Sequence, residues 1–291
     1  MTDPQPDQGA PAGSVAVVTD TTSYVPGEML DSLGVQCVSL YVGWDGKLTP
    51  ERDYTDLDAF YERLKSEPRL PTTSQPSVGD FLDVYRPLAE AGRDIYSIHI
   101  AEALSGTCQS AREAARTLAA EGHTAKVTVV DAATGAGGLG LLVIAAAEAA
   151  RAGAGIDEVA ETIERRRKGL KIYFCLDTLE YLRRGGRIGA AQAMVGTALK
   201  VKPILTFGTE IAPVDRVRTS ARAYARMGEY LTEMHAAGAR TWTVQKIQCE
   251  GPAAEMIERG RAVYGCEPCF VSEVGPVFCT HLGSGLLVGA F

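Results

Sequence analysis

The sequence predicts an α/β protein of two domains: an N-terminal domain built on a largely parallel sheet flanked by helices, and a C-terminal domain with a mixed or antiparallel sheet. Up to Lys168, short apolar runs typical of buried strands alternate with amphipathic helical patterns, an order that favours a parallel sheet covered on both faces. Beyond Lys168, a hairpin pattern and further strand–helix–strand patterns follow. With 291 residues, 46% of them hydrophobic and 22% charged, the chain is long enough for two medium domains. We expect a disordered leader over residues 1–13 and domains over residues 14–168 and 169–291.

The composition favours a cytoplasmic protein. Residues 1–13 contain Pro, Gln, Asp and Gly but no apolar stretch of the kind that a signal peptide needs. The longest apolar run, residues 137–147, is too short for a transmembrane segment. A net charge of -7 gives no reason to expect nucleic acid, which requires a basic face. The seven cysteines lack the spacing of a secreted scaffold, and Cys266 and Cys269 form an isolated CxxC, so we expect reduced thiols and no metal.

Helix caps and turn residues define the elements of the N-terminal domain. Pro26 and Gly34 bracket a first short helix. Thr55 is suited to be the N-cap of a second helix with apolar residues at helical spacing, and Ser77 is suited to be the N-cap of a third. We expect strands over residues 15–18, 35–42, 95–100 and 127–130, and helices over residues 26–34, 55–64, 78–90, from the turn at 104–107 to Gly122, over 137–152, and from Asp157 to Lys168.

The C-terminal domain shows similar signals. Asp177 and Glu180 form an acidic version of a capping box before a short helix, which Gly185 and Gly186 end. Gly208 marks the turn of a β-hairpin. We expect strands over residues 172–176, 201–207, 211–217, 241–249, 270–274 and 286–291, and helices over residues 177–184, 190–200, 220–236 and 253–264.

Two groups of hydroxyl residues are candidates for binding an anion. Ser105 lies in a small-residue turn between a strand and a helix, where unpaired N–H groups and the helix dipole favour a negative charge. The same position also suits the N-cap of that helix. Thr73 and Ser74 lie in a loop between Pro71 and Pro76, where hydroxyl clusters usually stabilise the turn itself. From these residues alone, both interpretations stay open.

Residues 135–140 match the G-x-G-x-x-G pattern between a strand and a helix. In a dinucleotide-binding fold this pattern directly follows the first strand, and an acidic residue ends the next strand. Here residues 132–134 intervene, and Asp157 falls at a helix start. The glycines therefore favour close packing of helix on sheet, and a nucleotide-binding oxidoreductase is an alternative function.

Six spaced segments together resemble the DegV family of bacterial fatty-acid-binding proteins. They follow the order of that family from Val15 to the C-terminus, which makes the resemblance far more specific than any single motif. The segments are residues 15–23 (VAVVTDTTS), 73–77 (TSQPS), 104–111 (LSGTCQSA), 176–188 (LDTLEYLRRGGRI), 201–205 (VKPIL) and 275–291.

The resemblance implies a protein that binds one long-chain fatty acid in a buried apolar tunnel, with no cofactor and no catalytic turnover of its own. In some members a separate ATP-binding kinase subunit phosphorylates the carboxylate of the bound acid. We expect Arg187, and with it Arg184, to face such a partner or its nucleotide. The residues expected to bind the carboxylate are Thr73, Ser74, Ser105, Gly106 and His281.

Some positions depart from the family pattern. Leu282 and Ser284 differ from its usual THTGPG block, Ala101 and Glu102 replace a usual pair of serines, and Ala132 replaces a serine. These changes leave the expected carboxylate contacts in place but affect the shape of the pocket.

Ser105 and His281 also suggest a second function, that of an esterase-like serine hydrolase. Ser105 does not lie in a G-x-S-x-G motif, however, and no acidic residue can be singled out to orient His281.

Overall fold

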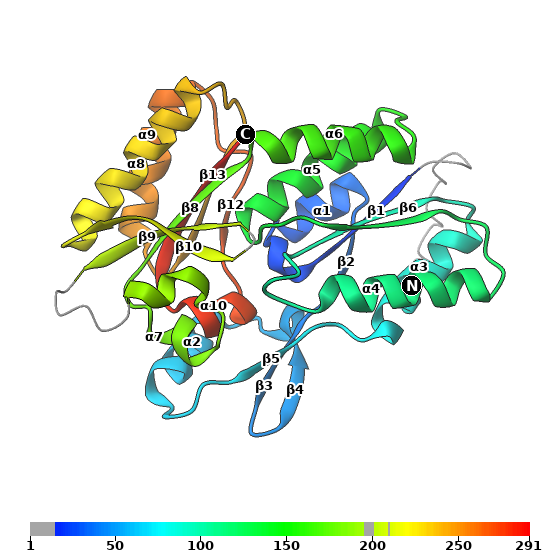
Figure 1. Cartoon of the computed structure of the whole chain (residues 1–291), viewed down its shortest axis with the longest axis horizontal. Helices are drawn as coiled ribbons and strands as arrows, with labels where there is room; N and C mark the ends of the chain where they lie inside the picture. The colour runs from blue at the N-terminus through cyan, green and yellow to red at the C-terminus, as the bar shows by residue number, and fades with distance from the viewer. Residues whose placement is uncertain (1–14, 195–200, 209) are drawn as a thin grey trace, which may run out of the picture.

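The computed structural model describes residues 15–194, 201–208 and 210–291, and its α/β architecture confirms the predicted fold class (Figure 1). A parallel sheet, sheet A, has the strand order β2-β1-β6-β7, and a mixed sheet, sheet C, has the order β10-β9-β8-β13-β11-β12. A small antiparallel sheet, sheet B, has the order β4-β3-β5. The predicted leader and residues 195–200 of a predicted helix lie outside the described residues.

Sheet A is covered by helices on both faces. Alternation along β6 directs Ser97 and His99 toward α3, where they contact Tyr85 and Phe81. Tyr96 on the opposite face belongs to the hydrophobic cluster of α5 and α6. The strands are β1 (Ala16–Asp20), β2 (Gln36–Val38), β6 (Ile95–His99) and β7 (Val127–Asp131); the helices are α1 (Gly27–Leu33), α3 (Val78–Glu90), α4 (Thr107–Ala120), α5 (Gly137–Arg151) and α6 (Ile156–Gly169).

Sheet C has α8 and α9 on its outer face, while its inner face packs toward α5 (Figure 1). Its neighbouring strands are antiparallel apart from β11 and β12, which are parallel. The elements are β8 (Lys171–Leu176), β9 (Lys202–Phe207), β10 (Ile211–Val217), β11 (Trp242–Ile247), β12 (Val271–Glu273), β13 (Gly285–Ala290), α8 (Ser220–Ala236) and α9 (Glu250–Tyr264).

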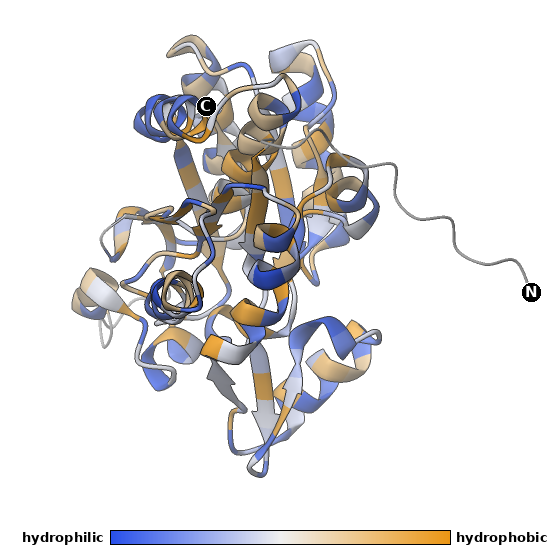
Figure 2. Cartoon of the chain, turned by 90° about the vertical axis from the view of Figure 1, so that its right-hand side faces the viewer, coloured by the Kyte–Doolittle hydropathy of each residue, from blue (hydrophilic) through white to orange (hydrophobic). Residues whose placement is uncertain are grey.

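Sheet B and three short helices complete the chain at the lower edge of the molecule in Figure 1. In Figure 2 the hydrophobic colours gather on the strands and inner helices, and the outer helical turns are mostly hydrophilic. The elements are β3 (Tyr41–Trp44), β4 (Lys47–Pro50), β5 (Thr72–Ser74), α2 (Leu57–Ser66), α7 (Glu180–Arg184) and α10 (Pro276–Leu282), with 3-10 turns at Thr21–Ser23, Glu51–Asp53 and Gly189–Met194.

Helix α5 lies between sheets A and C, and its glycines allow this close approach. A Cβ on Gly137 would lie 2.8 Å from Thr243, and a Cβ on Gly140 would lie 2.6 Å from Phe270. Both contacts are with side chains of sheet C or its flanking loop, so the G-x-G-x-x-G pattern serves helix–sheet packing. One hydrophobic cluster therefore runs from sheet A through α5 to sheet C. The division of the chain near Lys168 into two domains stays a prediction.

The sequence predictions were wrong at three places around sheet B. The strand predicted over residues 35–42 is two strands, since β2 pairs with β1 in sheet A while β3 pairs in sheet B. Residues 72–74, predicted as loop, form β5, because Tyr41, Val42 and Gly43 offer them an antiparallel edge. The strand at residues 47–50 was missed. Long-range pairing thus overrode local turn signals.

Other differences concern one additional helix and the starts of two predicted helices. The structure adds α10, which the sequence patterns did not indicate. The N-cap of α2 is Asp56 rather than Thr55, and its carboxylate accepts a hydrogen bond from Ala59 N at 2.9 Å. Before α7, the hydroxyl of Thr178 accepts from Glu180 N at 3.1 Å, so the predicted capping box from Asp177 does not form.

Candidate functional site

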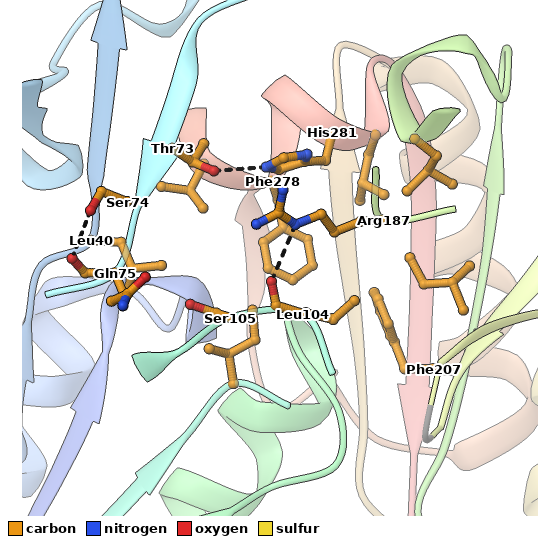
Figure 3. Close-up of a pocket in the computed structure, with 15 residues that line it drawn as sticks. Leu40, Thr73, Ser74, Gln75, Leu104, Ser105, Arg187, Phe207, Phe278 and His281 are labelled. Atoms are coloured by element: carbon orange, nitrogen blue, oxygen red, sulfur yellow. Dashed lines mark hydrogen bonds between the residues drawn. The ribbon is translucent and has the colours of Figure 1, made fainter. Parts of the chain in front are cut away.

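A cavity with an apolar interior and a polar rim lies where segments next to all three sheets meet α7 and α10 (Figure 3). The polar residues come from β5 and the loop after it, the loop between β6 and α4, the segment after α7, and α10. The apolar residues lining the cavity are Leu40, Ile100, Leu104, Leu182, Phe207, Ile211, Val277, Phe278 and Leu282; the polar ones are Thr73, Ser74, Gln75, Ser105, Arg187 and His281.

Thr73 and His281 form the central polar contact of the rim. Thr73 Oγ1 lies 2.8 Å from His281 Nε2, although the two residues are 208 positions apart in the sequence. Thr73 is held by strand β5, which pairs with β3, and His281 by the last turn of α10. Two of the predicted site residues are therefore brought into direct contact.

The surroundings of His281 determine which of its nitrogens bears hydrogen. Its Nδ1 is buried without a hydrogen-bond partner and lies against Gly185, where a Cβ would approach it to 2.2 Å. Burial, and secondarily the charge of Arg187, lowers the pKa of His281 to about 4, so the ring is neutral at pH 7. A single ring N–H is best placed on Nε2, where it donates to Thr73. The hydroxyl hydrogen of Thr73 is then free to donate to another acceptor.

Ser105 also lies on the rim, and its predicted role as an N-cap was wrong. Helix α4 begins at Thr107 with Gly106 as N-cap, and no side chain caps it. Ser105 Oγ instead lies 2.8 Å from Oγ1 of Thr107, and Thr107 is fully buried. Helix α4 starts one residue later than an N-cap at Ser105 would require. The Ser105 hydroxyl therefore faces the cavity rather than the helix N–H groups.

Ser74 and Gly106 have less direct access to the cavity than Thr73, Ser105 and His281. Ser74 lines the cavity, but its hydroxyl donates to the carbonyl of Gln75 at 3.1 Å. Gly106 is not among the lining residues; a Cβ there would lie 2.8 Å from the amide of Gln75, so this side chain covers it. The structure thus brings Thr73, Ser105 and His281 to one rim, with Ser74 beside them and Gly106 behind Gln75.

Arg187 joins the cavity rim to a neighbouring basic groove. Its Nη1 donates to Gly185 O at 2.8 Å, and its Nε lies 3.4 Å from Leu104 O (Figure 3). The groove has a volume of about 430 Å³ and shares Thr73, Arg187 and His281 with the cavity. Arg184, whose Nη2 donates to Pro68 O at 2.9 Å, lines this groove together with Arg69. Positive charge therefore gathers beside the polar rim.

Aromatic rings close the apolar interior of the cavity. Phe207 stacks on Phe174 with ring centroids 4.5 Å apart and meets Phe278 edge-on at 5.9 Å. The remaining space is about 50 Å³, room for a few water molecules at roughly 10–15 Å³ each. Since a long alkyl chain is larger, binding of such a ligand requires this space to widen.

Sequence reasoning missed several lining residues, namely Gln75, Leu182, Phe207, Ile211 and Phe278. Each is an ordinary residue of a strand, helix or loop in its local context. Gln75, Leu182 and Phe278 did lie inside segments on which the family resemblance rests, which is the one signal that pointed near them.

The contacts do not favour a serine hydrolase. The Nε2 of His281 lies against Thr73 rather than Ser105, and its Nδ1 has no acidic partner among the described residues. A serine–histidine–aspartate geometry does occur elsewhere: His99 lies 2.6 Å from Ser97 Oγ and 3.0 Å from Asp20 Oδ2. These three residues are fully buried, so no substrate can reach them. Asp20 also accepts the N–H of Ile100, so its carboxylate holds the C-terminal end of β6.

Within the described ranges, no helix is sufficiently long and apolar to cross a membrane.

Comparison with known proteins identifies the family. The family model described as "Uncharacterised protein, DegV family" matches residues 14–290. A DegV domain-containing protein of Streptomyces coelicolor is 39% identical over 276 residues, covering 94% of this chain and 96% of the relative. Protein DegV of Bacillus subtilis is 35% identical over 279 residues, covering 94% and 97%.

Solved structures agree with these relatives. The structure of DegV from Bacillus subtilis, described as a fatty acid binding protein, has a TM-score of 0.85 at 33% identity and covers 96% of this chain and 99% of that one. A Thermus thermophilus DegV family protein described by its fatty acid binding has a TM-score of 0.84 at 31% identity and covers 96% and 100%. The present chain therefore belongs to the DegV family.

Proposed function

We propose that this protein binds one long-chain fatty acid, with the acyl chain in the apolar cavity and the carboxylate at the polar rim. The observation that supports this most is the meeting of Thr73, Ser105 and His281 at the polar rim of a cavity with an apolar interior. Relatives of the same fold are described as fatty-acid-binding proteins.

The carboxylate would be held mainly by hydroxyl donors. His281 Nε2–H donates to Thr73, which directs the Thr73 hydroxyl hydrogen toward the ligand. Ser105 can donate a second hydrogen bond when Thr107 donates to Ser105. Hydrogen bonds to a charged acceptor are stronger than neutral ones and offset part of the cost of removing a carboxylate from water.

The acyl chain would supply most of the affinity. About fifteen methylenes at roughly 0.8 kcal/mol each give on the order of 12 kcal/mol of burial free energy. That exceeds the lower estimates of the association cost. The hydroxyl groups therefore fix the orientation of the ligand, and the alkyl chain holds it.

Extraction of the purified protein after denaturation, followed by mass spectrometry, tests this proposal. A free fatty acid in near-equimolar amount supports it. A nicotinamide or flavin in its place would support the alternative based on residues 135–140, and hydrolysis of an activated ester that Ser105→Ala abolishes would support a hydrolase.

We further propose that the bound carboxylate is presented to a separate ATP-dependent kinase. An oxygen of the carboxylate would attack the γ-phosphorus of ATP, giving an acyl phosphate and releasing ADP. The basic groove formed by Arg69, Arg184 and Arg187 lies beside the polar rim and suits the charge of the transferred phosphate.

The kinase step is tested with Arg187→Ala. We expect this variant to retain fatty acid but to lose most of its phosphorylation by the cognate kinase. Arg183→Ala is the matched control, because Arg183 is exposed and pairs with Glu180 on α7 outside the groove. Equal phosphorylation of Arg187→Ala and wild type would refute the role of Arg187.

A further inference from the structure

A buried carboxylate, Glu51, lies behind the wall of the cavity and has no role in the function proposed above. It belongs to the 3-10 turn after β4, and only 5% of its surface is exposed. Its Oε1 accepts hydrogen bonds from the hydroxyl of Tyr24 at 2.9 Å and from Val277 N at 2.8 Å, and its Oε2 accepts from the hydroxyl of Thr21. Both oxygens of this carboxylate are thus hydrogen-bonded to the protein itself.

Two of these bonds hold the start of α10. Val277, whose N–H donates directly to Glu51, lines the cavity. Phe278, the next lining residue, donates its N–H to the hydroxyl of Tyr24 at 3.1 Å, and Tyr24 in turn donates to Glu51. Glu51 therefore fixes the first turn of the helix that bears His281.

The third hydrogen bond of Glu51, from Thr21, connects it to another part of the cavity wall. Thr21 donates its hydroxyl hydrogen to Glu51, and its Oγ1 accepts the N–H of Leu40 at 3.2 Å. Leu40 lines the cavity and immediately precedes β3. One carboxylate consequently connects the backbone of α10 with the backbone that leads into sheet B.

Glu51 is accessible to protons from the side away from the cavity. Together with Thr21 and Tyr24 it lines a surface groove of about 710 Å³. Burial raises the pKa of Glu51 to about 7, so its charged and neutral forms coexist near neutral pH. The other titratable or charged groups around it or in the same groove are Asp20, Tyr24, Asp31, Cys37, Arg52, Tyr54, Glu273 and Cys279.

We propose that Glu51 is a positioning residue whose carboxylate holds the cavity wall closed over the acyl chain, and that its protonation speeds release of the lipid. The inference rests on the proposed fatty-acid binding. A proton on Oε2 leaves the bonds of Val277 N–H and the Tyr24 hydroxyl to Oε1 in place and points at Thr21. The Thr21 hydroxyl hydrogen then has to turn away, and a charge-assisted bond becomes a neutral, weaker one. The connection to Leu40 is loosened first.

The test measures release of a fluorescent long-chain fatty acid from the full chain into excess unlabelled fatty acid at pH 6 and pH 8. We expect wild type to release it about three- to tenfold faster at pH 6, because one charge-assisted bond becomes a weaker, neutral one. Glu51→Gln keeps the shape of the side chain and mimics the protonated form, so it should release at one fast rate at both pH values. His281, with a pKa lowered to about 4, stays neutral throughout this window.

Two further variants secure the result. Asp31→Asn removes an exposed carboxylate from the same groove and should keep the wild-type pH dependence. Thr21→Val removes the partner of Oε2 and should release quickly at both pH values, which keeps the idea testable if Glu51→Gln does not fold. A wild-type pH ratio in Glu51→Gln or Thr21→Val would overturn the inference. Wild type that binds lipid but releases it independently of pH would also overturn it, whereas wild type that binds no fatty acid refutes the proposed function.

Discussion

The contact between Gly185 and His281 gives a sharp test of the carboxylate site. Gly185 ends α7 with φ -78°, a conformation that alanine adopts without strain. The substitution Gly185→Ala therefore changes only the space beside the residue. Its new methyl group would lie 2.2 Å from His281 Nδ1, whereas ordinary contacts begin near 3.4 Å.

The geometry sets the size of the effect. His281 must move by about 1.2 Å, a shift large enough to disrupt the 2.8 Å hydrogen bond between His281 and Thr73. The Thr73 hydroxyl loses the bond that directs its hydrogen to the ligand. A lost hydrogen bond to a charged group is worth about 1.5–3 kcal/mol, so we expect fatty-acid affinity to fall roughly ten- to hundredfold.

The assay is a displacement titration of a fluorescent fatty acid on delipidated protein, with thermal unfolding measured in parallel. Gly186→Ala is the matched control: its φ of +70° strains an alanine by about 1–2 kcal/mol, but nothing lies within 4 Å of the new methyl group. This control should lower the melting temperature and leave binding unchanged. An affinity of Gly185→Ala within twofold of wild type would refute the assigned role of His281.

Three other outcomes are expected. Thr73→Val and Ser105→Ala should each weaken fatty-acid binding by about ten- to hundredfold in the same titration, because each removes one hydrogen-bond donor to the carboxylate. Circular dichroism should show an intact fold in both variants, and undiminished binding in both would contradict the site. Phe207→Ala should favour longer acyl chains by about fourfold in relative affinity for each methylene newly accommodated, measured as a ratio of dissociation constants across chain lengths; an unchanged ratio would show that the ring does not limit the chain. Because the pKa of His281 is lowered to about 4, the unfolded chain binds a proton below pH 6.5 that the folded chain does not bind until about pH 4. The free energy of unfolding therefore falls by up to about 3 kcal/mol as pH falls through this window. Urea unfolding of wild type and His281→Gln should show that the variant lacks this part of the pH dependence.

Local signals in the sequence determined several elements well. Ser77 was predicted as the N-cap of the third helix, and its hydroxyl accepts from Asp80 N at 3.1 Å in a reciprocal capping box. Helix α8 spans Ser220–Ala236 as predicted, and the hairpin of β9 and β10 forms around the expected turn. Caps and periodicity involve residues only a few positions apart, so the sequence determines them directly.

The same local reasoning failed where distant segments pair. Residues 72–74 resemble a proline-bounded loop, yet they form β5 because Tyr41 lies opposite Ser74 in sheet B. Ser105 resembled an N-cap, yet α4 begins at Thr107 and leaves its hydroxyl at the cavity. Neither outcome depends on the neighbouring residues alone.

The sequence by itself determined the fold class, most helices and, through the family resemblance, the candidate residues Thr73, Ser105 and His281. Only the tertiary structure decided that Thr73 contacts His281, that Gly185 leaves room for this histidine, and that Glu51 joins α10 to the segment before β3. The physical reason is that such contacts join positions up to 226 residues apart, and their geometry exists only once the sheets and α5 have packed together.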